Sequence, residues 1–245
     1  LTHTGVDPKL IERAKASLDK GYARLTSFEC KQKGYEWFGG DPGHEALTAY
    51  GLLEFTDMSQ TRDVDQAMIQ RTRAWLLSRR NGKGSFERNP RALDSFGGAP
   101  QETTDAYCLW ALLEAGEKGL DTEVAYVKDL ALKSKDSYIV ALGANVLSLA
   151  KDADAKKVMD KLVAGQTKEG AVDGAVTSIT RSGGEALQIE TTSLAILAWL
   201  RDPAYAGSVE KAMKFVAESC KAGRFGSTQS TVLALRAIVT YDKLR

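Results

Sequence analysis

Side chains that could transfer a proton at neutral pH or bind a metal ion are few in this sequence. Two histidines, His3 and His44, and three cysteines occur among 245 residues. Cys30, Cys108 and Cys220 are widely spaced and odd in number, which fits neither a disulfide framework nor a zinc site. We expect these cysteines to be small core hydrophobes. We predict no bound metal ion and no other cofactor.

Acidic residues give no specific catalytic signal either. His44 stands next to Glu45 at an expected helix start, where we expect a hydrogen-bonded histidine. No glycine-rich segment has the spacing of a phosphate-binding loop. With 32 acidic residues, close acidic pairs arise by chance, and we assign none as a general acid and base: Asp41 with Glu45, and Glu102 with Asp105. We therefore expect a protein that is not an enzyme.

Charge and hydropathy limit the partners. The chain has 33 Lys and Arg against 32 Asp and Glu, which gives a net charge of +1 and no overall attraction to nucleic acid or anionic membranes. No segment reaches the roughly 18 consecutive apolar residues of a membrane span, and the first residues show no signal-peptide pattern. We predict no nucleic-acid partner and no membrane insertion. Because the sequence does not begin with Met, we expect a fragment or a processed product.

Five segments share one plan, a polar start followed by a dense apolar run. Acidic or hydroxyl residues at a helix start accept hydrogen bonds from the free backbone N–H groups of the first turn. The runs 106–113 and 194–200 consist of apolar and aromatic residues, and a helix that is apolar all round must be buried on all sides. These buried helices are predicted at five places: 45–55, 102–115, 137–150, 190–200 and 227–238.

The segments between these runs have one apolar face and one charged face. This pattern predicts amphipathic helices with one side in water. In the first of them, one face carries Leu10, Ala14, Leu18, Tyr22 and Leu25. The amphipathic helices are predicted at the following ranges: 8–25, 63–80, 121–133, 153–164 and 208–222.

Alternation of the two helix types predicts helical hairpins, with the buried helices as an inner ring and the amphipathic helices outside. We predict an all-α fold, a single domain over residues 1–245 that forms an α/α toroid of the α6/α6 barrel type. An open solenoid is the alternative, but its paired helices would look more alike. Because an outer helix comes first, the first inner helix of a six-hairpin barrel would lie upstream of Leu1, and we expect the domain to be truncated at its N-terminus.

Two connections, 81–101 and 165–189, are longer than simple turns. In the second, alternating residues on both sides of the Ser-Gly-Gly at 182–184 predict a small β-hairpin that caps the barrel. A third stretch rich in glycine and aromatic residues contains Trp37 and Phe38, which we expect to plug a barrel end.

The motifs resemble a known family. "GEALQIETTSLAILAWL" (184–200) and "GRFGSTQSTVLALRAI" (223–238) are similar to the thioester domain of the α2-macroglobulin and complement C3 family, as are "GYARLTSFECKQKGYEWFGG" (21–40) and "ALTAYGLLEF" (46–55). The similarity runs in register from about residue 8 to 242. It implies an α6/α6 toroid, and it implies a module of a secreted or periplasmic protein that captures proteases or cell surfaces covalently, in protease inhibition or innate defence. The implied partners are the target and the other domains of the parent protein.

The family's reactive group has no match in this sequence. In the family, a Cys sulfur is acylated by the side chain of a Gln three residues later, in a Cys-Gly-Glu-Gln motif at the start of the first inner helix. Cys30 is followed by Gln32, at the wrong spacing and after an outer helix, and neither Cys108 nor Cys220 has a Gln three residues later. That motif would lie upstream, on the first inner helix.

A second family feature lies in the loop before the inner helix at 102. Some complement members have a His there that takes over the acyl group. Counting forward from Phe86 places Asp94 at this position, and counting back from the Gly-Gly pair at 97–98 places Ala92 there. Neither is a His, so the resemblance implies direct attack by amines on any thioester in the parent protein.

Two enzyme classes remain as alternatives. Protein prenyltransferase β subunits and terpene cyclases share a toroid of this kind, and Trp110, Trp199, Tyr50 and Tyr107 could line an aromatic cavity. Missing zinc ligands and acidic motifs argue against them. Sugar-cleaving α6/α6 barrels need a carboxylate pair over an open groove, whereas these inner helices look densely packed.

Overall fold

The structure is a computed structural model that describes residues 7–89 and 98–244. Within these ranges the chain is helical and contains no strand, only isolated β-bridges. The all-α class is thereby confirmed. The helices have the following bounds: α1 (Pro8–Thr26), α2 (Glu45–Met58), α3 (Gln66–Ser78), α4 (Gln101–Glu114), α5 (Asp121–Lys133), α6 (Ser137–Leu149), α7 (Ala155–Ala164), α8 (Gly184–Trp199), the 3₁₀ helix η1 (Pro203–Tyr205), α9 (Ala206–Glu218) and α10 (Thr228–Lys243).

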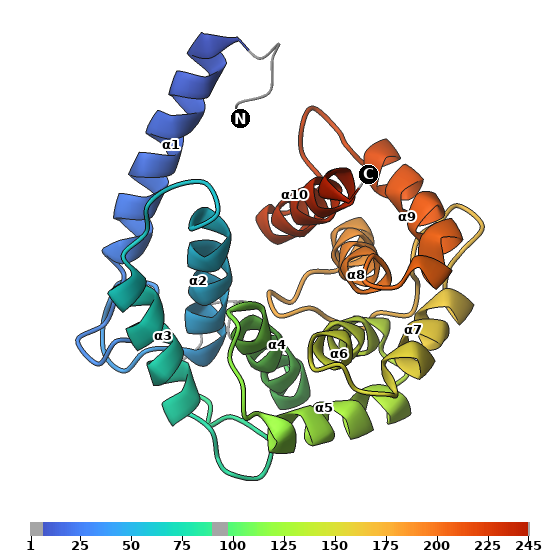
Figure 1. Ribbon diagram of the computed structural model, residues 1–245, viewed down its shortest axis with the longest axis horizontal. Helices are drawn as coiled ribbons and strands as arrows, with labels where there is room; N and C mark the ends of the chain where they lie inside the picture. The colour runs from blue at the N-terminus through green and yellow to red at the C-terminus, as the bar shows by residue number, and fades with distance from the viewer. Residues whose placement is uncertain (1–6, 90–97, 245) are drawn as a thin grey trace.

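The helices form two layers along an arc. Figure 1 shows α2, α4, α6, α8 and α10 around the centre and α3, α5, α7 and α9 on the outside. Each inner helix packs on the next inner helix along the chain, and the outer helices pack on their inner neighbours. The predicted division into buried inner and amphipathic outer helices is confirmed for these elements. In Figure 1 the arc is open between α2 and α10, and α1 extends beyond α2 on the same side.

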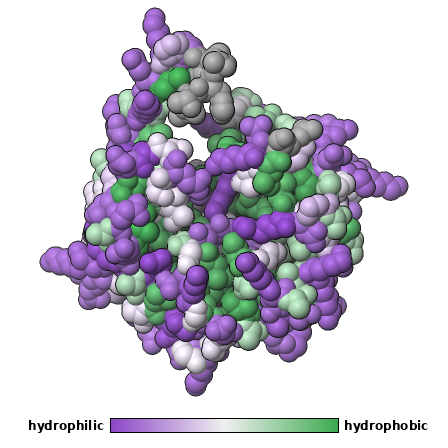
Figure 2. All heavy atoms as spheres, viewed as in Figure 1, coloured by the Kyte–Doolittle hydropathy of each residue, from purple (hydrophilic) through white to green (hydrophobic). Residues whose placement is uncertain are grey.

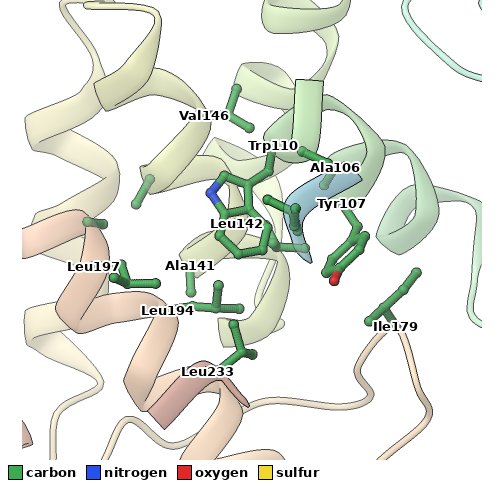
Figure 3. Packing of buried hydrophobic residues seen from close by; sticks show 14 of the residues in the cluster. Ala106, Tyr107, Trp110, Ala141, Leu142, Val146, Ile179, Leu194, Leu197 and Leu233 are labelled. Atoms are coloured by element: carbon green, nitrogen blue, oxygen red, sulfur yellow. The ribbon is translucent and has the colours of Figure 1, made fainter. Parts of the chain in front are cut away.

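Inner helices α4, α6 and α8 form the centre of the core, and long stretches of each are buried on every side. Trp110 of α4 packs among Leu142, Val146 and Leu194 (Figure 3). Small residues allow the two layers to approach closely, because a Cβ atom at Gly143 of α6 would collide with the side chain of Ala131 on α5. Helix packing at this site therefore depends on the missing side chain.

A repeated hydrogen bond explains part of the polar starts of the inner helices. An isolated β-bridge closes a tight loop after each of the outer helices α1, α3, α7 and α9. A backbone N–H of that loop then donates to a side chain near the start of the polar segment in the next inner helix. We name these four bonds the loop latches: Tyr35 N to Thr48 Oγ1 (2.9 Å), Phe86 N to Asp105 Oδ1 (2.9 Å), Val172 N to Thr192 Oγ1 (2.9 Å) and Phe225 N to Thr231 Oγ1 (3.1 Å).

The predicted β-hairpin around 182–184 is not present. Gly184 begins α8, so the residues expected to form the second strand are the first turns of that helix. Before it, the Ser178 hydroxyl accepts a hydrogen bond from the backbone N–H of Ser182, which closes a turn without a strand. Leu187 and Ile189, two residues apart, point to different sides of the helix, and both are buried because α8 is packed on nearly every side.

Three predicted burials were wrong. Cys220 is exposed, although Cys30 and Cys108 are buried as expected. Phe38 is 81% exposed and plugs nothing, while Trp37 is half-buried with its ring 5.0 Å from that of His44. Leu10 is 56% exposed, and no residue of α1 is buried. Figure 1 gives the reason for α1, because the first half of this helix extends beyond the described inner helices.

Candidate functional site

The surface between α2 and α10 contains two pockets, one at each end of these helices. The N-terminal pocket, about 430 Å³ in volume, is lined by Leu47 and Tyr50 of α2, by Gln229 of α10 and by hydroxyl residues around it. The C-terminal pocket, about 680 Å³, lies between the last turns of α2 and α10 and reaches α4 and α8. Because like ends of α2 and α10 meet in each pocket, the two helices run in the same direction. We call the surface that joins the two pockets the α2–α10 groove.

Apolar side chains of α10 are exposed to solvent along this groove. Leu235 and Val239 both line the C-terminal pocket and are 49% and 50% exposed. The central inner helices α4, α6 and α8 bury residues of this kind on both sides. In the space-filling view, apolar residues show between the hydrophilic side chains of the face seen in Figure 1 (Figure 2). Within the described chain, α10 thus has an apolar face that no helix covers.

Charged side chains gather at the C-terminal pocket. The guanidinium of Arg236 lies 3.1 Å from a carboxylate oxygen of Glu114 and 3.5 Å from one of Asp57. Glu114 also accepts from Arg201 at 2.9 Å and from the indole N–H of Trp110 at 3.0 Å. Arg236 stacks over the Trp110 ring, 5.0 Å from its centroid, which adds a cation–π contact. This network ties α2, α4, α10 and the segment that follows α8 together at one end.

Burial raises the pKa of two carboxyl groups of α2 in the same pocket. For Asp57 the nearby Arg236 opposes the effect, and Glu114 reinforces it. For Glu54 burial is again the main cause, the charge of Asp57 adds to it, and a hydrogen bond with Tyr50 opposes it. Both groups therefore bind a proton more readily than an exposed carboxylate would.

The N-terminal pocket is lined by hydrogen-bond acceptors. Gln229 is 4% exposed; its Nε2 donates to the hydroxyl of Tyr107 at 3.4 Å, and its Oε1 has no partner among the described residues. Ser227 begins α10 as its N-cap, and its hydroxyl donates to Glu190 Oε1 at 3.4 Å. Glu190 is fully buried. Burial raises the pKa of Glu190, and the hydroxyls of Ser182, Ser178 and Ser227 oppose that shift.

His44 was expected at a helix entrance with a hydrogen-bonded ring. It does stand at the N-cap position of α2, but neither ring nitrogen has a partner among the described residues. The imidazole is buried and touches Trp37, and burial lowers the pKa of His44, so the ring is neutral at pH 7. It does not line the N-terminal pocket. His3, Asp94 and Ala92 lie outside the described residues.

The acidic pairs considered from the sequence have separate structural roles. Glu45 is buried and accepts from Arg79 Nε at 2.8 Å and from the backbone N–H of Asn89 at 2.7 Å. Asp41 instead accepts from the backbone N–H of Gln32.

Asp105 is buried and accepts the loop-latch hydrogen bond from the backbone N–H of Phe86, whereas Glu102 is exposed. Neither pair forms a general acid and base.

Sequence reasoning missed Gln229 and Glu190 as site residues. Both stand in the polar starts predicted from the sequence for inner helices, where an ordinary capping role explains their type, although Glu190 lies inside α8, which begins at Gly184. A long polar side chain next to a buried apolar run was the available signal, because Glu and Gln are seldom fully buried without a partner.

Other features argue against the enzyme alternatives. Tyr107 and Trp110 pack against each other and against the surrounding aliphatic residues, so they do not line an open aromatic cavity (Figure 3). Over the described ranges 7–89 and 98–244, no three His, Cys, Asp or Glu side chains come close enough to hold a metal ion.

The described part of the chain contains no helix that is both long and apolar enough to cross a membrane.

Comparison with known proteins assigns the family. A family model described as the A-macroglobulin TED domain matches residues 2–241. The chain is 28% identical to ovostatin of Gallus gallus over 91% of its length, 27% identical to complement C3 of Eptatretus burgeri over 96%, and 23% identical to thioester-containing protein 1 (allele S3) of Anopheles gambiae over 94%. It spans only 15–17% of the length of these relatives. The match over nearly the whole chain shows that this protein belongs to the A-macroglobulin TED domain family.

Proposed function

We propose that this chain is the helical scaffold of a thioester domain in a longer, secreted or periplasmic protein. That protein would capture proteases or cell surfaces covalently, in protease inhibition or innate defence. The family assignment and the names of the relatives support the class. The single observation that carries the proposal is the α2–α10 groove, which has the direction and the lining needed to hold one more inner helix.

The groove would be filled by an inner helix from another part of the parent protein. Leu235 and Val239 offer that helix an apolar surface, and the bare face of α1 that includes Leu10 would cover it from outside. With this helix in place, six inner helices would close an α6/α6 toroid. A helix parallel to α2 and α10 would begin at the N-terminal pocket, which places a Cys-Gly-Glu-Gln motif in its first turn at that pocket.

The scaffold would act as a shield and a carrier. Inside a dry site a thioester hydrolyses slowly, and a proteolytic cut elsewhere in the parent would move the domain and expose the acyl group. An amine of the target then attacks the carbonyl carbon, the C–S bond breaks, the Cys sulfur leaves as a thiolate, and the amine proton neutralises it. The family resemblance puts Asp94 or Ala92, and no His, at the acyl-transfer position, so the amine would attack directly. The acyl group is consumed once, so the domain is not an enzyme.

Intact mass tests this proposal. The chain, extended upstream by one helix of the parent, is weighed before and after methylamine treatment while free thiols are counted. We expect a mass gain of one methylamide and one newly freed thiol. A well-folded protein that shows neither would be a scaffold without a thioester, and covalent capture would be rejected.

A further inference from the structure

The N-terminal pocket contains an acceptor that lacks a donor. Gln229 lines the pocket, is 4% exposed, and its Oε1 accepts no hydrogen bond from the described residues. A buried acceptor without a partner is destabilising, because it has lost its hydrogen bonds to water and gained none in the protein. A donor group is therefore expected to occupy this pocket in the parent protein.

The side chain of Gln229 is held in place. Its amide nitrogen donates to the Tyr107 hydroxyl at 3.4 Å, and Tyr107 is itself buried with its ring edge against Trp110. The carbonyl end of the amide is the end that remains available.

A buried carboxyl group lies behind the same pocket. Ser227, which lines the pocket, donates to Glu190 Oε1 at 3.4 Å. Hydroxyl oxygens of Thr180 and Ser182 complete the polar wall. The lining thus offers acceptor oxygens, which carry partial negative charge, and the partner that fits it is rich in N–H donors and carries positive potential.

The first turn of a helix has these two properties. Its first backbone N–H groups have no partner within the helix, and the helix dipole places partial positive charge there. Because α2 and α10 both begin at this pocket, a parallel helix in the groove would begin there too. We propose that Gln229 is a positioning residue whose side-chain carbonyl binds a first-turn N–H of the helix in the α2–α10 groove, beside the Ser227 hydroxyl that is hydrogen-bonded to Glu190. The inference rests on the proposed function for the occupant of the groove.

Two variants in the parent protein separate this role from a purely structural one. Gln229→Met keeps the length of the side chain but removes the carbonyl, whereas Gln229→Glu keeps an acceptor at the same reach. Gln70→Met, on the exposed side of α3, is the matched control. Amide hydrogen exchange of the docked helix and spontaneous thiol release are measured on all three and on the parent.

We expect Gln229→Met to speed exchange of the first-turn amides by about tenfold, the effect of losing one hydrogen bond. Thiol release should rise by a similar factor, and Gln229→Glu should stay near the parent in both. Equal first-turn exchange in Gln229→Met and Gln70→Met would overturn the inference. Faster exchange spread along α10 would also overturn it, because Gln229 would then only stabilise its own helix.

The proposed function can fail independently. If the parent releases no thiol with methylamine while first-turn exchange still responds to Gln229→Met, covalent capture is rejected and the positioning role stands. A small ammonium ion is the other donor that could fill the pocket. Equal first-turn exchange in the parent and in Gln229→Met, together with trimethylammonium binding that Gln229→Met abolishes, would assign the pocket to that ion and overturn the inference.

Discussion

Thr192 shows at the scale of one residue how a polar group works inside the inner layer. It is fully buried, yet its hydroxyl has a specific task, to accept the backbone N–H of Val172 in the loop before α8. Thr48 and Thr231 do the same at their own loops, and Asp105 does so with a carboxylate. The types and positions of these residues in the sequence suggested helix caps. The backbone N–H that each of them accepts lies up to 20 residues away, which no local pattern reveals.

Replacing Thr192 tests the loop latch. Thr192→Val keeps the shape and removes the acceptor, so the N–H of Val172 stays buried without a partner. We expect the free energy of unfolding to fall by about 1–3 kcal/mol in urea titration. Thr192→Ser retains the hydroxyl and should lose clearly less. Equal losses in the two variants would mean that the bond contributes nothing to stability.

The sequence predicted the helices better than any other feature of the structure. All ten α-helices of the described ranges were expected from periodicity, and most of their ends differ by only a few residues from the predicted ranges. The exception is α8, which begins at Gly184 instead of 190, because the alternation at 185–189 indicated a strand, whereas packing in the inner layer makes these residues the first turns of the helix. Exposure of α1 could not be predicted, since it depends on what packs beside a helix and not on its own pattern.

Two helical glycines provide a matched test of packing between layers. A Cβ at Gly143 would collide with Ala131, whereas a Cβ at Gly21 of α1 meets nothing within 4 Å. Gly143→Ala should destabilise the protein by about 1–3 kcal/mol through overpacking. Gly21→Ala should raise stability by up to about 1 kcal/mol, because alanine favours the helix. Thermal unfolding of both variants measures the two changes in stability. If Gly143→Ala raised the stability, α5 would have moved away from the added methyl group at no cost.

The molecule as a whole is an arc with an open side. The site lies on that open side, where the predicted alternation of helices left a place for one more inner helix. The residues of the site were not predicted. Gln229 and Ser227 line one pocket, and Glu190, which is far from them in the sequence, is hydrogen-bonded to Ser227 only in the assembled fold.

Leu235 tests whether the open side is covered in the parent protein. In this chain the side chain is half in water, so Leu235→Asn should change the free energy of unfolding by no more than about 0.5 kcal/mol. In the chain extended by the upstream helix, the same change should cost about 2 kcal/mol or more, since the site becomes buried. Chemical denaturation of the chain and of the extended chain, each with and without Leu235→Asn, gives the change in the free energy of unfolding in both backgrounds. The same small effect in both backgrounds would exclude a helix over Leu235.

The loop latches also bear on how the protein is made. Their donors and acceptors are separated by 13, 19, 20 and 6 residues along the chain. Contacts this local form quickly, and chains fold in units as they leave the ribosome. Each loop can therefore fasten to its inner helix as soon as that helix has been synthesised, before the next hairpin exists. The arc would grow hairpin by hairpin during translation, from α2 towards α10.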